Sequence, residues 1–195
     1  MDVKEIQDAV RRKYVEVSSS AAGKFNYPTG MDGAIQQGYD PAIIRSMPDE
    51  VLESFCGVGN PFTAGPVKAG ETILDVGCGA GFDLIVASSL VGQNGKVCGI
   101  DLTPEMAEKA KSNLKKYGVQ NYDVRTAGAE SIPYPDDTFD VVISNGVLNL
   151  SPLKEKCFRE IYRVLKPDGR LQFADIILKE QCAGAMCSTL DAWSN

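Results

Sequence analysis

The chain has 195 residues, of which 44% are hydrophobic, so it is long and apolar enough to form one domain with a substantial core. Its formal net charge is −6 and it has no dense Lys/Arg tract, which argues against nucleic acid as a partner. It contains no histidine, which excludes a Ser-His-Asp triad, a histidine-ligated metal and a histidine general base.

No uncharged apolar run approaches the roughly 20 residues that a membrane span needs, and the first residues do not resemble a secretory signal. The six cysteines are scattered without CxxC or zinc-ligand spacing: Cys56, Cys78, Cys98, Cys157, Cys182 and Cys187. We therefore expect a cytoplasmic protein with reduced thiols, no metal site and no membrane partner.

The N-terminal part, residues 1–70, is expected to contain helices and a lid segment within the same domain as the rest. Apolar residues at helical spacing predict a helix over 3–17, and a proline followed by acids predicts a short helix over 48–55. Residues 18–47 are rich in Gly and Ser and are expected to be irregular. Long irregular segments are functional lids or disordered; the aromatic residues Phe25, Tyr27 and Tyr39 favour a lid, with a mobile linker as the alternative.

From residue 71 to 195 the pattern alternates between strands and helices. Strands are expected at 72–76, 96–101, 122–126, 139–144 and 170–176, and helices at 83–90, 103–116 and 154–165. This alternation predicts an α/β, Rossmann-like fold with a parallel sheet and helices on both faces.

The most informative stretch is residues 73–83 (ILDVGCGAGFD), an apolar strand that leads through a glycine turn into a helix. Glycine is needed where a ligand approaches the main chain or where φ is positive. Free N–H groups at the start of the helix point at whatever lies above the turn. This stretch therefore predicts a site for a nucleotide-like cofactor.

Two cofactors compete for this turn. A dehydrogenase also has a glycine turn and an acid about 20 residues later, and Asp101 fits that position in either case. However, the glycines follow G-x-G-x-G rather than G-x-G-x-x-G, and Asp75 would repel a pyrophosphate. S-adenosylmethionine has no phosphate; its ammonium can satisfy Asp75 while main-chain N–H groups of the turn bind its carboxylate. The charge pattern favours S-adenosylmethionine, with a dehydrogenase as the remaining alternative.

Four motifs together resemble those of class I S-adenosylmethionine-dependent methyltransferases over about residues 70–178. They are residues 73–81 (ILDVGCGAG), 99–101 (GID), 129–130 (AE) and 164–169 (VLKPDG). The resemblance implies that the glycines line the methionine moiety and that the acid after the second strand accepts ribose hydroxyls. It also implies that the next leucine packs on the adenine, that the Ala-Glu pair edges the adenine ring, and that the asparagine after the fourth strand faces the methionine end.

The cofactor-binding residues expected in this chain are Asp75, Gly77, Gly79, Gly81, Asp101, Leu102, Ala129, Glu130 and Asn145. No catalytic side chain is identified. Methyl transfer is compatible with the absence of histidine, because a sulfonium is already electrophilic and the reaction needs alignment and exclusion of water more than a proton relay.

A narrower resemblance is to the arsenite methyltransferase branch. It rests on residues 55–61 (FCGVGNP), 102–106 (LTPEM) and 143–152 (ISNGVLNLSP). That branch binds trivalent arsenic through cysteines at two positions that correspond here to Val58 and Gly146, with Cys56 shifted by two residues. The expected function is methyl transfer to a small-molecule acceptor, with arsenite or a related thiophilic species as a candidate. The alternative is a non-catalytic S-adenosylmethionine-binding regulatory or interaction protein.

The class I methyltransferase core usually has two more strands beside the fifth, and this sequence lacks them. The fifth strand would then be an apolar sheet edge open to pairing. We expect either a fragment of a longer protein or an edge that is covered by the tail or by a second copy, which makes a homodimer through this strand a candidate assembly.

Overall fold

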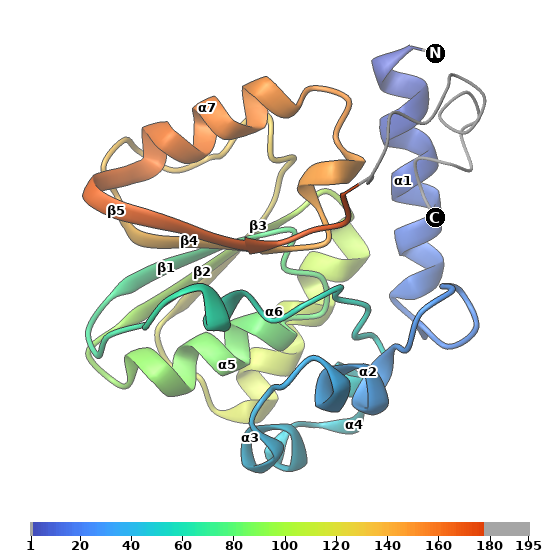
Figure 1. The fold of residues 1–195 in the computed structure, drawn as a ribbon, viewed down its shortest axis with the longest axis horizontal. Helices are drawn as coiled ribbons and strands as arrows, with labels where there is room; N and C mark the ends of the chain where they lie inside the picture. Colours follow the sequence, from blue (N-terminus) through green and yellow to red (C-terminus); the bar gives the residue numbers. More distant parts are fainter. Residues whose placement is uncertain (1, 178–195) are drawn as a thin grey trace.

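Within residues 2–177, five parallel strands form one sheet in the order β3-β2-β1-β4-β5 (Figure 1). The structure is a computed structural model, and it describes residues 2–177. The strands are β1 (Thr72–Val76), β2 (Lys96–Asp101), β3 (Tyr122–Thr126), β4 (Phe139–Asn145) and β5 (Leu165–Ala174). Strand β5 begins five residues earlier than predicted, because Leu165 already pairs with Phe139 before a shift of register.

Helices cover both faces of the sheet, so the predicted Rossmann-like architecture is confirmed. Helices α5 (Phe82–Val91) and α6 (Pro104–Tyr117) lie on one face, and α7 (Lys154–Val164) lies on the other (Figure 1). Helix α6 ends at Gly118, which adopts the left-handed conformation expected of a C-terminal glycine. The short 3-10 turns are η1 (Pro61–Ala64) and η2 (Leu148–Leu150).

The N-terminal part is more regular than the sequence indicates. Helix α1 (Val3–Val17) is confirmed, and α4 (Asp49–Leu52) lies within the predicted short helix. The expectation of an irregular segment over 18–47 is wrong in two places, where α2 (Gly30–Gln36) and α3 (Pro41–Ser46) form. Helix α3 begins with Pro41 and is capped by the Asp40 carboxylate, which accepts a hydrogen bond from the Ala42 N–H.

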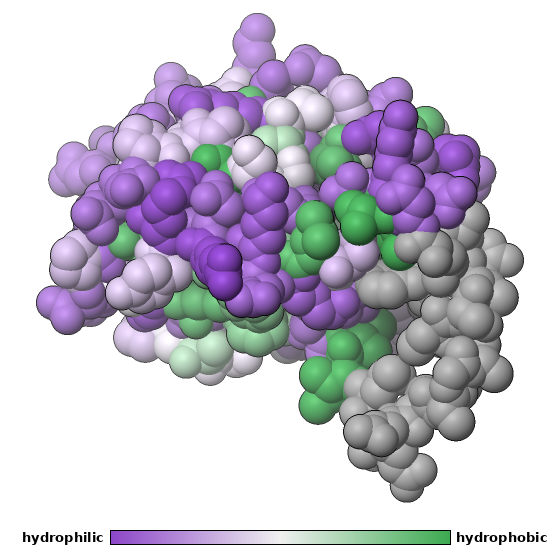
Figure 2. Space-filling model, turned by 90° about the horizontal axis from the view of Figure 1, so that it is seen from above, coloured by the Kyte–Doolittle hydropathy of each residue, from purple (hydrophilic) through white to green (hydrophobic). Residues whose placement is uncertain are grey.

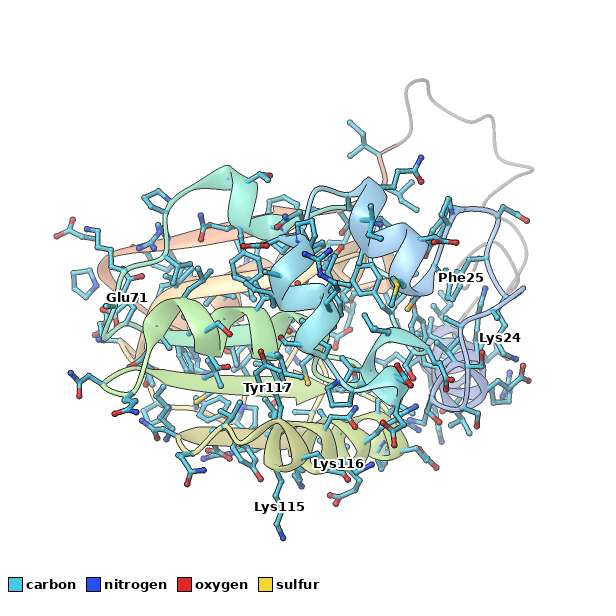
Figure 3. The ribbon with its side chains drawn as sticks, turned by 90° about the horizontal axis from the view of Figure 1, so that it is seen from below. Lys24, Phe25, Glu71, Lys115, Lys116 and Tyr117 are labelled. Atoms are coloured by element: carbon cyan, nitrogen blue, oxygen red, sulfur yellow. The ribbon has the colours of Figure 1, made fainter. Side chains whose placement is uncertain are left out.

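Side chains of the N-terminal part share a hydrophobic core with the sheet-covering helices. Tyr39 and Phe55 pack on Phe82 of α5, with ring centres 4.9 and 4.2 Å away. Polar contacts at the end of α6 complete this junction. Lys116 Nζ lies 2.9 Å from a carboxylate oxygen of Glu50, and the Tyr117 hydroxyl lies 2.9 Å from Ser46 Oγ (Figure 3). Residues 30–55 are therefore packed against the core.

Helix α1 stands apart from this junction, beside the carboxyl ends of the strands (Figure 1). Its buried residues are Ile6, Val10 and Val17. Val17 packs with Ala80 and Met106 in a small separate cluster. The loop after α1 turns back along it, where Lys24 pairs with Glu16 at 3.0 Å and Phe25 stacks near Tyr14 (Figure 3).

Strand β5 forms one edge of the sheet within residues 2–177. Apolar side chains near this edge are exposed, among a mostly hydrophilic surface (Figure 2): Phe158, Phe173, Ile176 and Ile177. The proposed pairing of this edge with a second copy stays a prediction, and the tail that could cover it lies outside the described residues. None of the helices in residues 2–177 has both the length and the apolar composition of a membrane span.

Candidate functional site

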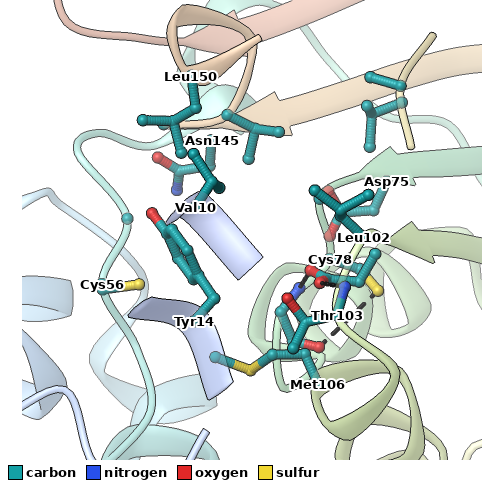
Figure 4. Close-up of a pocket in the computed structure, with 18 of the residues that line it drawn as sticks. Val10, Tyr14, Cys56, Asp75, Cys78, Leu102, Thr103, Met106, Asn145 and Leu150 are labelled. Carbon is teal, nitrogen blue, oxygen red and sulfur yellow. Dashed lines mark hydrogen bonds between the residues drawn. The ribbon is translucent and has the colours of Figure 1, made fainter. Parts of the chain in front are cut away.

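A cavity opens at the carboxyl ends of β1, β2 and β4, and α1 closes its outer side. In a parallel α/β sheet, ligands bind at this end, where the strand order reverses, which here is between β1 and β4. The cavity volume is about 120 Å³, far above the roughly 10–15 Å³ that one water needs. Val10 and Tyr14 of α1 face Asp75, Leu102 and Cys78 across it (Figure 4).

The glycine turn forms the floor of the cavity, but its three glycines differ in role. Gly77 has φ +80°, and a Cβ there would lie 2.3 Å from Val147 Cγ2, so this position needs glycine for packing. Gly79 also has a positive φ, with open space where its side chain would be. Gly81 is not among the cavity-lining residues, and a Cβ there would face Ala110 of α6 at 3.4 Å. The expectation that Gly77, Gly79 and Gly81 line the methionine moiety stays a prediction.

The N–H groups of this turn are already used by the protein. Those of Gly77 and Cys78 both donate to the Ile100 carbonyl, at 2.8 and 2.9 Å, and that of Gly79 donates to Asp101. These three groups already have acceptors within the protein, so the ligand carboxylate that the sequence predicts here would be bound by other N–H groups. Free N–H groups remain at the first turn of α5, as at any helix start.

Asp101 joins the glycine turn to the end of β2. One carboxylate oxygen accepts from the Gly79 N–H at 2.9 Å, and the other accepts from the Thr103 N–H at 2.8 Å. Burial raises the pKa of Asp101 to about 6, although these two hydrogen bonds and one from the Thr103 side chain act to lower it. A carboxylate has about four lone pairs, so the group can still accept a hydrogen bond from a ligand in the cavity.

Asp75 lines the cavity without a partner. Its side chain is 2% exposed, and no described residue donates a hydrogen bond to it. Burial raises its pKa well above the usual value, and repulsion from Asp83 and Asp101 adds to the rise. A buried carboxylate in this position favours a ligand that brings a positive charge or a donor.

Leu102, Ala129 and Glu130 line the cavity as expected. One Glu130 oxygen accepts hydrogen bonds from Gln7 of α1 at 3.3 Å and from Ser151 at 2.6 Å. Glu130 therefore connects α1 to the segment after β4, a role that its position next to the third strand does not indicate.

Asn145 lines the cavity, but its amide forms hydrogen bonds with residues of the N-terminal part of the chain. Its Oδ1 accepts from the N–H groups of Val58 and Gly59 at 2.8 and 3.2 Å. Its Nδ2 lies 2.8 Å from the Gly59 carbonyl, 3.1 Å from Asp83 and 3.1 Å from the Tyr39 hydroxyl. The amide thus binds the main chain of Val58 and Gly59, and its expected position at the methionine end of the ligand stays a prediction.

Sequence reasoning missed the buried pair that completes this network. Tyr39, 3% exposed, donates to Asp83 at 2.7 Å, and Asp83 is itself 6% exposed. Burial raises the pKa of Asp83 to about 6, although the hydrogen bonds from Tyr39 and Asn145 act to lower it. No spacing rule links residues 44 positions apart, so only a tertiary contact reveals them.

The N-terminal residues that line the cavity come from α1 and from 51–57, and none comes from residues 18–47. The role of residues 18–47 as a lid stays a prediction. The periodicity of Val10 and Tyr14 predicts their shared helix face. It does not predict what that face covers.

The two positions that correspond to arsenic-binding cysteines lie side by side. A Cβ on residue 146 would lie 3.2 Å from Val58 Cγ1. The isopropyl group of Val58 therefore lies directly beside the position where a side chain of residue 146 would begin. Cys56 lines the cavity nearby, and burial raises the pKa of its thiol to about 12, with a further rise from Asp101. Cys182 and Cys187 lie outside the described residues.

Comparison with known proteins identifies related chains. Residues 67–195 match the family model described as a methyltransferase domain. The chain is 35% identical over 190 residues to an arsenite methyltransferase of Halobacterium salinarum, covering 90% of this chain and 48% of that protein. The chain spans about half the length, or less, of the curated arsenite methyltransferases that it matches.

Two solved structures share the fold. One is a SAM-dependent methyltransferase from Aquifex aeolicus, with 31% identity and a TM-score of 0.57, covering 77% of this chain and 75% of that one. The other is an arsenic(III) S-adenosylmethionine methyltransferase from Chlamydomonas reinhardtii, with 38% identity and a TM-score of 0.61, covering 71% of this chain and 50% of that one.

We expect Asn145→Ala to destabilise the protein by about 2–3 kcal/mol, because it leaves the N–H groups of Val58 and Gly59 without their acceptor. Urea denaturation measures the effect. The matched control is Asn149→Ala, because the Asn149 amide oxygen is buried without a hydrogen-bond partner; its change should stay within about 0.5 kcal/mol. Equal effects of the two substitutions would contradict the role of Asn145.

We expect Asp75→Asn to stabilise the ligand-free protein at pH 7.5, on the order of 1 kcal/mol, by removing an unpaired buried charge. A carboxyl with a raised folded pKa binds more protons in the folded than in the unfolded state, so its contribution to stability is lost as pH rises through that pKa. The gain should therefore shrink towards pH 4, where the wild-type carboxyl is protonated.

Urea denaturation at the two pH values measures this gain. The exposed Asp8→Asn is the control and should change stability by less than about 0.5 kcal/mol at either pH. Destabilisation by Asp75→Asn at pH 7.5 would show that the carboxylate has a stabilising partner.

Proposed function

We propose that this chain, which belongs to the family of S-adenosylmethionine-dependent methyltransferases, binds S-adenosylmethionine in the cavity beside β1 and β2 and transfers its methyl group to a small-molecule acceptor. The observation that carries the proposal is Asp75, a buried carboxylate without a partner that lines this cavity. Enzymes of this family use S-adenosylmethionine, whose ammonium and sulfonium groups suit such a carboxylate.

The residues of the cavity fit the parts of this ligand. Asp75 would bind the ammonium group, which removes the cost of its burial. Asp101 would accept the ribose hydroxyls with the lone pairs that Gly79 and Thr103 leave free. Leu102 and Ala129 would pack against the adenine ring, since both line the cavity beyond Asp101.

When bound, S-adenosylmethionine supplies an activated methyl group on a positively charged sulfur, which becomes a neutral thioether after the transfer. The task of the chain is then to hold the acceptor in line and to exclude water. Val10 and Tyr14 of α1 are placed for this task, because they cover the outer side of the cavity. The Gln7–Glu130 hydrogen bond holds the same helix against the cavity rim.

The acceptor is a separate question, because the chain is about half as long as its arsenite-specific relatives. A trivalent arsenic acceptor needs thiolates, and Cys56 is the one described cysteine near the outer wall of the cavity. Its raised pKa keeps the thiol protonated at neutral pH. Arsenite remains a candidate through Cys56 with Cys182 or Cys187, beside organic acceptors that need no thiolate.

Incubation of the chain with methyl-labelled S-adenosylmethionine tests the function directly. Arsenite with a thiol reductant and a hydroquinone are offered as separate acceptors. We expect labelled product with at least one of them. Loss of arsenite methylation in Cys56→Ser, with hydroquinone methylation retained, would assign the thiol to arsenic. Binding of the cofactor without transfer to any acceptor would favour the non-catalytic alternative.

We expect Asp101→Ala to weaken S-adenosylmethionine binding by about 1.5–3 kcal/mol, since it removes hydrogen bonds to a charged acceptor. The affinity of the wild type should fall as pH drops below about 6, where Asp101 and Asp83 take up protons. Titration calorimetry measures both effects, with Asp8→Ala on the exposed face of α1 as the control. An unchanged affinity in Asp101→Ala would remove this residue from the site.

A further inference from the structure

The cavity has two chemically different walls. Three of its acidic residues, Asp75, Asp83 and Asp101, lie on the side of the glycine turn and the strand ends. The fourth, Glu130, lies where α1 meets the segment after β4 and accepts hydrogen bonds from Gln7 and Ser151. Among the described residues, neither lysine nor arginine lines the cavity. A ligand with negative charge would therefore meet carboxylates, and no described residue of the lining offers it a cation.

The outer wall is mainly hydrocarbon. Side chains from α1, from the segment after α4 and from the segment after β4 build it: Val10, Phe55, Val147, Leu150 and Pro152. Its two titratable groups are uncharged at neutral pH. Burial raises the pKa of Tyr14, with a further rise from Cys56, and burial raises the pKa of Cys56 itself.

Nearby lysines have their ammonium groups against other atoms of the protein, oxygen atoms for Lys109 and Lys154 and an aromatic ring for Lys13. Lys109 Nζ lies 2.6 Å from the Ser18 carbonyl and 2.6 Å from Ser54 Oγ. Lys154 Nζ lies 2.8 Å from the Ser151 carbonyl and 3.0 Å from that of Asn149. Lys13 Nζ lies 4.5 Å from the centre of the Phe25 ring. None of these three residues is part of the cavity lining.

Most polar atoms that reach the outer wall are already engaged. The Ser151 hydroxyl and the Gln7 amide both donate to Glu130, and the Asn145 amide binds the main chain of Val58 and Gly59. The Tyr14 hydroxyl makes no hydrogen bond to a residue that the structure describes. It is therefore the polar group of this wall that is left to meet a ligand.

We propose that the methyl acceptor is an uncharged, mainly apolar small molecule whose polar atom forms a hydrogen bond with the Tyr14 hydroxyl. The proposal rests on the proposed function, because it places the cofactor on the acidic side of the cavity. An ion moved from water to a wall without counter-charge loses far more solvation than a neutral molecule does. In the proposed arrangement the cofactor occupies the side of Asp75 and Asp101, so its own ammonium and sulfonium, and not the acceptor, face these carboxylates.

Three probes of one shape test this charge preference. Benzyl alcohol is neutral, whereas benzoate and benzylamine are ionised at pH 7.5. Each is titrated by NMR into the chain saturated with S-adenosylhomocysteine, after calorimetry has established that this product binds. We expect benzyl alcohol to bind about tenfold tighter or more than either ion. An ion that binds as tightly as the alcohol, or a lack of saturable binding by all three, would overturn the proposal.

Two substitutions show whether the wall itself sets the preference. Tyr14→Phe should weaken benzyl alcohol binding about three- to tenfold through loss of one hydrogen bond. Leu150→Lys, which places a cation on the same wall, should gain benzoate binding and lose benzyl alcohol binding. Unchanged alcohol affinity in Tyr14→Phe would remove the hydroxyl from the proposal, and benzoate still excluded by Leu150→Lys would show that charge is not the cause.

Loss of cofactor binding and loss of charge discrimination would have different consequences. If S-adenosylhomocysteine and S-adenosylmethionine do not bind, the proposed function fails and the acceptor class falls with it. If they bind and the probes do not discriminate by charge, only the acceptor class is wrong.

Discussion

The amide of Asn145 is the contact on which the arrangement of the site depends. It lies at the carboxyl end of β4, where the sheet meets the N-terminal part of the chain. With one oxygen and one nitrogen it binds the main chain of residues 58 and 59, and it also reaches Tyr39 and Asp83. A Cβ on Gly57 would lie 2.4 Å from this amide nitrogen, so glycine is required for the close approach. Phe55 and Cys56 are carried into the cavity wall by the same segment.

The cavity also contains three buried carboxylates that destabilise the free protein. Asp75, Asp83 and Asp101 are all buried, and burial raises the pKa of each. Two of them receive hydrogen bonds from the protein, whereas Asp75 receives none from the described residues. Such groups lower the stability of the free protein at neutral pH and favour a ligand with a positive charge. The free protein is less stable because the ligand site needs a carboxylate that has no partner within the protein. Such a trade of stability for binding is usual at functional sites.

The two sides of the cavity explain how one small space can serve two molecules. Carboxylates beside the glycine turn suit the charged cofactor, and the hydrocarbon wall from α1, Phe55 and the segment after β4 suits a neutral acceptor. Helix α1 contributes to both sides, since Gln7 binds Glu130 while Val10 and Tyr14 face the outer wall. The packing of a single helix therefore positions cofactor-side and acceptor-side groups relative to each other.

Local pattern in the sequence determined the sheet, the glycine turn, and the positions of Asp75 and Asp101. These follow from strand periodicity, from φ angles that only glycine tolerates, and from the fact that parallel strands end at one edge. Tertiary structure alone decided that Gly81 faces α6, that Asn145 binds residues 58 and 59, and that α1 lines the cavity. The physical reason is that periodicity shows which face of an element is buried. Which distant residue that face meets depends on long-range packing.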